Sequence, residues 1–226
     1  MTEMSVAQIL AWLKRHGSQR NIDGMARYAI VAPKVFGISV GTLKQLGKKL
    51  GHDHDLALAL WKTGWYEARM LAAFVDEPAR VTSAQMDRWA NDFDNWAICD
   101  HNYFHLFDRT PFAWAKVTKW STSNDEFVKR AAFALIASIG VHDKGAPDAP
   151  FIKALRLIER AATDDRNFVK KGVNWALRVV GRRNPRLNAA AIRIATRLAA
   201  SPHPAPRWIG KDALREFAKV AARNKK

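Results

Sequence analysis

Apolar residues recur at three- and four-residue spacing along almost the whole chain of 226 residues, and this periodicity most constrains the fold. Such spacing places apolar side chains on one side of an α-helix, whereas a half-buried strand needs alternation, and no alternating run rich in Val, Ile or Thr stands out. The sequence predicts an all-α protein, with helices near residues 5–16, 21–31, 39–50, 53–63, 65–75, 83–92, 95–107, 112–120, 125–139, 150–162, 167–181, 186–200 and 210–222. The prolines of residues 202–206 are expected to lie in a break.

Two segments of the chain repeat each other at an offset of 41 residues. Residues 127–131 read Phe-Val-Lys-Arg-Ala, residues 168–172 read Phe-Val-Lys-Lys-Gly, and Gly140 corresponds to Gly181. HEAT-type repeats have periods of about 40–47 residues and stack helix pairs into a curved solenoid. We therefore predict a curved α-solenoid of HEAT-like repeats with a concave basic groove. No low-complexity linker divides the chain, so we expect a single domain over residues 1–226.

Positive charge is concentrated in the last third of the chain. The formal net charge is +16, and residues 167–226 contain 15 Lys and Arg but only two acids, Asp212 and Glu216. A solvated surface normally mixes both signs, so this one-signed stretch indicates a polyanionic partner. Solubility alone explains the last few residues but not the patterned segments before them. The basic C-terminal end, residues 207–226, also resembles a membrane-surface helix, but the basic helices that precede it belong to the repeat, which favours nucleic acid.

Several other classes of protein are not supported. The single Cys99 excludes a disulfide framework and a multi-cysteine zinc site. There is no apolar run of the roughly 18 residues that a membrane span needs and no secretory signal, so we expect a cytoplasmic protein that binds no membrane. His101 and His105 lie one helical turn apart but lack the Glu of a zinc helix. We expect neither a metal nor a cofactor.

One carboxylate stands out within the predicted helix 95–107. Trp96, Asp100, Tyr103 and Phe107 fall on one side of it, so Asp100 lies inside an aromatic stripe. A carboxylate in such surroundings must be paired, protonated or functional, because an unpaired buried charge is costly. The alternative is that Asp100 caps a neighbouring helix or pairs with an arginine.

The predicted helix 167–181 carries an aromatic residue on its basic face. Lys171, Trp175, Arg178 and Arg182 share that face, a combination that suits stacking and cation–π contacts beside a nucleic-acid backbone. Alternatively, Trp175 packs into an adjacent helix pair. The predicted phosphate contacts, for which a solvated face is the alternative, are Lys170, Lys171, Arg178, Arg182, Arg183, Arg186, Arg193 and Arg197.

Four segments resemble the AlkD-like alkylpurine DNA glycosylases. They are Trp-Ala-Ile-Cys-Asp at residues 96–100 with the region around Arg130, Gly-Val-Asn-Trp-Ala-Leu-Arg at 172–178, and Met-Ala-Arg-Tyr at 25–28. The resemblance runs over roughly residues 19–200. It implies HEAT-like repeats that bind duplex DNA in a concave groove and excise cationic N3- and N7-alkylated purines.

The resemblance also implies roles for single residues. Asp100 corresponds to the catalytic aspartate, Trp96 and Trp175 to the tryptophans of the cleft, Arg130 to the cleft arginine, and Tyr28 to a tyrosine near the lesion. Relatives often carry an acidic residue where this chain has Ala97, and the interval between Arg130 and Trp175 leaves Lys129 or Lys171 as the alternative cation.

These observations predict a monomeric DNA glycosylase of base-excision repair, with duplex DNA containing alkylated purines as its substrate. Two alternatives remain at this stage. One is a non-catalytic HEAT-type scaffold that binds distorted DNA, favoured by Ala97 and the strong positive charge. The other is a protein–protein adaptor, since helical solenoids commonly present extended binding surfaces.

Overall fold

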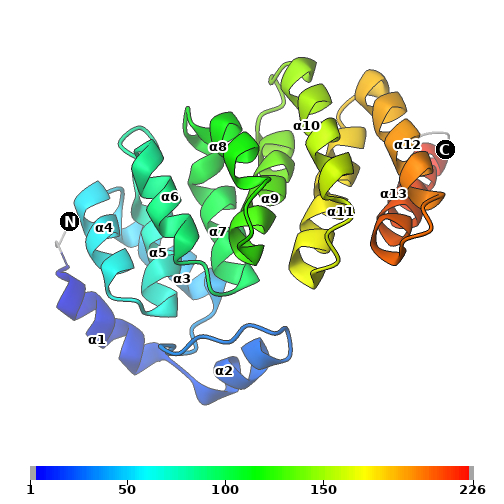
Figure 1. Ribbon diagram of the computed structural model, residues 1–226. Helices are drawn as coiled ribbons and strands as arrows, with labels where there is room; N and C mark the ends of the chain where they lie inside the picture. Colours follow the sequence, from blue (N-terminus) through cyan, green and yellow to red (C-terminus); the bar gives the residue numbers. More distant parts are fainter. Residues whose placement is uncertain (1–3, 224–226) are drawn as a thin grey trace. The chain divides into compact units, whose positions relative to one another are not determined.

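The computed structural model describes residues 4–223, which fold into thirteen α-helices and one short 3-10 helix, with no β-strand among them (Figure 1). The prediction of an all-α protein is confirmed. In chain order the elements are α1 (Val6–His16), α2 (Gln19–Ala26), α3 (Val40–Leu50), α4 (His54–Lys62), α5 (Tyr66–Val75), α6 (Ser83–Asn91), α7 (Trp96–His105), η1 (Phe107–Arg109), α8 (Ala113–Trp120), α9 (Glu126–His142), α10 (Asp148–Ala161), α11 (Asn167–Gly181), α12 (Pro185–Ala199) and α13 (Pro204–Arg223). Within residues 4–223, every helix is too short or too polar to span a bilayer.

Two of the predicted helices differ clearly in their bounds. α2 ends at Ala26 rather than near residue 31, and Ala29 then adopts a φ of 56°, outside the right-handed helical region. α13 begins at Pro204 rather than near residue 210. Pro202 lies in the break between α12 and α13, as expected. For Pro204 and Pro206 the expectation is wrong, because they occupy the first turn of α13, where a backbone N–H has no partner within the helix. Of the basic end 207–226, residues 224–226 lie outside the described part of the chain.

Polar side chains cap most of the helix starts. Ser5 and Gln8 form a reciprocal capping box at the start of α1. Asp53 accepts a hydrogen bond from the Leu56 N–H at 2.9 Å and so starts α4. Asn95 does the same for α7, accepting from two N–H groups. These caps satisfy donors that have no acceptor within their own helix, and they fix where the functional helices begin.

The chain divides into two compact units, Met1–Thr110 and Pro111–Lys226, and each is described by itself. In the N-terminal unit α5 packs between α3 and α7 and is covered by α4. α6 joins α4 through the buried indoles of Trp61 and Trp89, which stack with their ring centroids 4.0 Å apart. Whether the chain forms a single domain with a concave groove depends on how the two units are placed relative to each other. That part of the sequence analysis stays a prediction.

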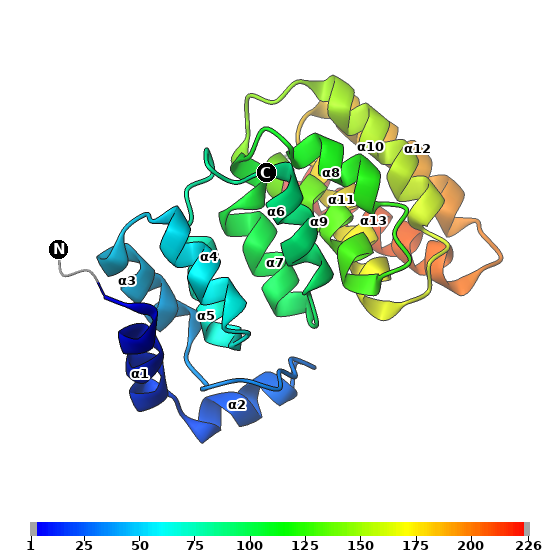
Figure 2. The same ribbon diagram turned by 60° about the vertical axis from the view of Figure 1, so that its left-hand side comes forward.

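The C-terminal unit is a stack of helix pairs in two layers. α9, α11 and α13 pack side by side in one layer, and α8, α10 and α12 lie on the other side, a grouping that can be followed in Figure 2. α12 and α13 approach very closely at Gly210, where a Cβ atom would lie 2.2 Å from the Ala199 nitrogen. Only glycine fits at that crossing.

The 41-residue repeat corresponds to α9 and α11, and its glycines mark close helix contacts. A Cβ atom on Gly140 would lie 2.6 Å from Val179 of α11, and one on Gly181 would lie 2.4 Å from Phe217 of α13. The repeated Phe127 and Phe168 also touch, with ring centroids 5.4 Å apart. The repeat in the sequence therefore corresponds to a repeated helix contact: in α9 and again in α11, a glycine lets the next helix of this layer pack closely.

A buried carboxylate holds the segment between α2 and α3 against α5. Glu67 is fully buried and accepts hydrogen bonds from the backbone N–H groups of Phe36, Gly37 and Ile38 at 3.0, 2.6 and 3.2 Å. Gly37 has a φ of +83° and lies against the Ser18 carbonyl, so the chain needs glycine there. Glu67 thereby anchors the irregular segment that also carries Tyr28.

Substituting Glu67 tests this anchor. Glu67→Ala leaves three N–H groups without an acceptor in a dry interior, so we expect the free energy of unfolding to fall by about 3 kcal/mol or more. Glu159→Ala is the matched control, because Glu159 forms an exposed pair with Arg197 and its loss should cost less than about 1 kcal/mol. Urea unfolding followed by circular dichroism measures both. Equal losses would show that Glu67 anchors nothing.

Candidate active site and nucleic-acid interface

The candidate catalytic carboxylate lies on α7, within the N-terminal unit. Trp96 is the first residue of α7, and Asp100 follows one turn later on the same face. Both are half-buried, whereas Cys99 and Tyr103 are fully buried. The predicted aromatic stripe therefore passes from the core to the surface, and Asp100 lies where it emerges. A carboxylate in this position is screened from bulk water on one side while its other side is accessible.

The structure brings Trp96 and Tyr28 together. The Trp96 indole Nε1–H donates a hydrogen bond to the Tyr28 carbonyl oxygen at 2.8 Å, across 68 positions of sequence. The Tyr28 side chain itself is 71 % exposed. Because this bond fixes the orientation of the indole beside Asp100, the segment anchored by Glu67 contributes to the geometry of the candidate site.

The two histidines of α7 support its packing. His101 is buried, and its Nε2–H donates to the Met70 carbonyl of α5 at 2.8 Å. Burial, with His105 close by, lowers the pKa of His101 to about 3, so the ring is neutral at physiological pH. Among residues 4–223 no group of three or more His, Cys, Asp or Glu side chains is arranged to hold a metal ion.

Arg130 of α9 is buried in the C-terminal unit. Its Nη1 donates to the Phe168 carbonyl of α11 at 2.8 Å, and its stem packs against Gly172. The equivalent residue in the repeat, Lys171, is exposed, so the two repeated cations have different surroundings. The geometry gives Arg130 a role in positioning the first turn of α11.

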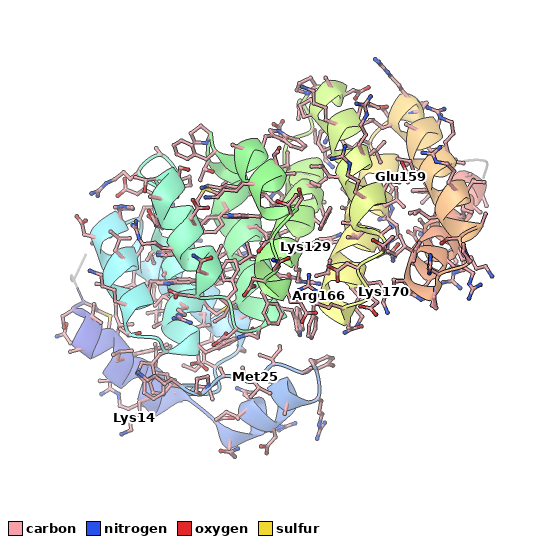
Figure 3. All side chains as sticks on the ribbon, in the orientation of Figure 1. Lys14, Met25, Lys129, Glu159, Arg166 and Lys170 are labelled. Atoms are coloured by element: carbon pink, nitrogen blue, oxygen red, sulfur yellow. The ribbon has the colours of Figure 1, made fainter. Side chains whose placement is uncertain are left out.

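Of the two alternative cations, Lys129 is engaged and Lys171 is exposed. Lys129 and Arg166 both bind Asp164, with nitrogen–oxygen distances of 2.9 and 2.7 Å, and their side chains are labelled in Figure 3. The hydrogen bond from Arg166 lowers the pKa of Asp164 well below its usual range, with Lys129 adding to the effect. Lys171 forms no ion pair within residues 4–223, so its ammonium is not engaged by a carboxylate there.

The basic face of α11 is partly neutralised by α13. Asp212 accepts from the Asn174 side chain at 2.7 Å and lies 3.6 Å from Arg178, while Glu216 pairs with Arg182. Burial opposes ionisation of Asp212, but the hydrogen bonds from Asn174 and from Arg215 lower its pKa. Both acids of this stretch thus bind the arginines that were candidate phosphate contacts. Trp175 is half-buried between Lys171 and Arg178 on the same helix.

The remaining predicted contacts lie elsewhere in the unit. Arg183 donates to the carbonyls of Gly140, Asp143 and Ala146 at 3.0, 2.8 and 2.9 Å, so it closes the loop after α9. Arg193 and Arg197 lie on the exposed face of α12, in the other layer from α11, and Arg197 pairs with Glu159. Arg186 is exposed in the first turn of α12. The structure therefore separates the α11 cations from those of α12.

Sequence reasoning missed what Arg183 and Glu67 do. Arg183 adjoins Arg182 in a basic run, and its carbonyl partners lie about 40 positions earlier in the chain, so local pattern carries no signal for the loop it closes. Glu67 looks like an ordinary first-turn acid of a helix. For both residues, only the tertiary contact reveals the role.

The family model described as "DNA alkylation repair enzyme" matches residues 9–217, and the chain therefore belongs to this family. The fold is similar to a solved structure described as "a new family of proteins related to the HEAT-like repeat DNA glycosylases with affinity for branched DNA structures". The TM-score is 0.80 at 19 % sequence identity, covering 96 % of this chain and 95 % of that chain. This likeness confirms the predicted HEAT-like fold. No curated protein matches the chain.

The contacts of Arg183 predict a stability effect that Arg186 does not share. Arg183→Ala removes three charge-assisted bonds and the stacking of the guanidinium on Phe151, so we expect a loss of about 2 kcal/mol in the free energy of unfolding. Arg186→Ala, at an exposed position, should change it by less than about 0.5 kcal/mol. Urea denaturation compares the two. If Arg183→Ala unfolds like the wild type, its side chain is free to bind phosphate instead.

Proposed function

We propose that this protein is a DNA glycosylase that hydrolyses the N-glycosidic bond of cationic N3- and N7-alkylated purines in duplex DNA. The observation that carries the proposal is Asp100, half-buried where the aromatic stripe of α7 reaches the surface, one turn after an indole held in place by the Tyr28 carbonyl. Membership in the DNA alkylation repair enzyme family supports it. No cofactor or metal is part of the proposal.

The chemistry suits a single carboxylate. Alkylation at N3 or N7 makes the purine cationic, so the base leaves without needing a general acid. Cleavage of the bond from C1′ to the base nitrogen leaves the bonding electrons on the departing base and positive charge on the deoxyribose. A carboxylate close to C1′ stabilises that charge and orients or deprotonates the water that attacks C1′. Glycoside hydrolases use carboxylates on a similar transition state.

The other residues have supporting roles in this proposal. The Trp96 indole, one turn before Asp100, attracts positive charge through its π-face and packs against the sugar. Trp175, beside Lys171 on α11, offers the DNA another aromatic face. Lys171 on α11 binds a flanking phosphate, because it is the exposed cation beside Trp175. Arg130 acts as a positioning residue by holding the Phe168 carbonyl in the first turn of α11. Tyr28 presents its exposed ring to the DNA.

Asp100→Asn tests the mechanism. The amide keeps the size of the side chain and removes the negative charge, so release of 7-methylguanine or 3-methyladenine from alkylated duplex DNA should slow by about 100-fold or more. Asp23→Asn is the control, since Asp23 is an exposed carboxylate of α2 in the same unit, and it should release base like the wild type. Base release at the wild-type rate by Asp100→Asn would refute the assigned mechanism.

A second candidate function is a non-catalytic scaffold for distorted DNA. Two observations favour it: Ala97 stands where the resemblance expects an acidic residue, and the similar solved structure is described as having affinity for branched DNA. A scaffold of this kind needs the cationic surface of the C-terminal unit and makes no demand on Asp100.

Two measurements separate the candidates. The proposed glycosylase releases base from alkylated duplex, whereas a scaffold binds a junction more tightly than a linear duplex of the same length and releases no base. For either DNA-binding function, log affinity against log salt should fall with a slope of about 0.9 per neutralised phosphate. A flat salt dependence without base release would contradict both and favour a protein partner.

A further inference from the structure

Trp208 of α13 is the exposed tryptophan of this protein. All nine tryptophans lie within the described residues. Trp208 has 41 % of its surface exposed, whereas each of the other eight is half-buried or buried. It follows Pro204 by four positions, so it lies one turn into the helix on a regular, packed element. A large aromatic ring at an exposed, rigid position is ready for stacking on a partner without further ordering of the backbone.

A cation orients this ring. The Lys170 ammonium of α11 lies 5.4 Å from the centroid of the Trp208 ring, close enough for a cation–π contact. α11 and α13 pack side by side, so the pair is fixed by the core of the C-terminal unit. Lys170 covers part of one ring face and adds positive charge, while the exposed part of the indole remains available.

The charges around Trp208 are not neutralised. The two acids of residues 167–223 are engaged elsewhere: Asp212 with Asn174, Arg178 and Arg215, and Glu216 with Arg182. In contrast, Arg207 and Lys211, which flank Trp208 along α13, are exposed and form no ion pair within the described chain. An aromatic face among unneutralised cations favours a ligand with flat rings and negative charge.

We propose that Trp208 and Lys170 form a binding site for an unpaired base of single-stranded DNA, with Arg207 and Lys211 binding the phosphates of the same strand. Single strands are bound in this manner elsewhere, by bases stacked on aromatic side chains within a positively charged groove. The inference rests on the DNA binding of the proposed function but not on base excision, and nothing in it involves Asp100.

The proposed ligand follows from which DNA surfaces an indole reaches. Within a duplex the faces of the bases are covered by their neighbours, so a surface tryptophan can stack only on the outer face of a terminal base pair. A single-stranded arm, such as the arm of a fork, exposes those faces together with its phosphates. Stacking depends little on base identity, so the site should bind arms of any sequence.

The first experiment compares two labelled, undamaged DNAs by fluorescence anisotropy with the full chain. One is a blunt duplex and the other is the same duplex with a single-stranded oligothymidine arm. Trp208→Ala should weaken binding to the armed duplex by about 5- to 30-fold, the loss of one stacked base. Its affinity for the blunt duplex should stay close to that of the wild type. Trp208→Phe should retain most of the preference for the arm.

Lys219→Ala is the charge control. Lys219 is an exposed cation of α13 about three turns beyond Trp208, and its removal should weaken binding to both DNAs alike. Lys170→Ala, in contrast, should weaken binding to the armed duplex more than to the blunt one. Melting curves confirm that each variant is folded, which is expected because Trp208 is exposed.

A direct contact is tested by photocrosslinking. An arm that contains 5-iododeoxyuridine should crosslink to Trp208 in the wild-type protein, as identified by peptide mass spectrometry. The proposal is overturned if Trp208→Ala binds the armed duplex like the wild type, or loses affinity for both DNAs equally. It is also overturned if Trp208→Ala loses binding to vesicles of phosphatidylcholine and phosphatidylserine but not to the arm. Base release by the wild type, measured separately, decides the glycosylase proposal on its own.

Discussion

The contact between α11 and α13 determines the surface chemistry of the C-terminal unit. Residues 167–226 contain only two acids, and both lie on α13 against α11. Asp212 binds Asn174 and Arg178, and Glu216 binds Arg182. The carboxylates therefore help set the register of the two helices and neutralise the arginines that they bind. The exposed lysines and arginines that have no carboxylate partner, such as Lys171, Arg207 and Lys211, supply the attraction for a polyanion.

Close packing makes this contact possible. Gly181 lets Phe217 of α13 approach α11, and Gly140 lets Val179 of α11 approach α9 in the same manner. Larger residues at either glycine would push the neighbouring helix away and pull apart the polar pairs that depend on it. The repeated glycines thus connect a pattern visible in the sequence to the distribution of charge on the folded unit.

The fold was predictable to a greater extent than the site. Helical periodicity identified all thirteen helices, twelve of which bury apolar residues, whereas α2 buries none. It failed at Pro204, where position within the first turn decides whether proline breaks a helix or begins one. Periodicity also predicted that Lys171, Trp175 and Arg178 lie on the same face of α11. Pattern could not reveal that Arg183 closes a loop or that Glu67 binds three backbone N–H groups, because the partners of both residues lie far away in the sequence.

The family to which this chain belongs raises the question of how little separates a DNA-repair enzyme from a DNA-binding scaffold. A similar fold at 19 % identity belongs to a protein described by its affinity for branched DNA, so the scaffold alone does not specify the chemistry. In the proposed reaction the alkylated base already carries the positive charge that makes it leave, and the protein adds little beyond one well-placed carboxylate. An enzyme and a binder built on this fold would then differ chiefly at the position of Asp100, while the cationic layer of α11 and α13 serves both equally.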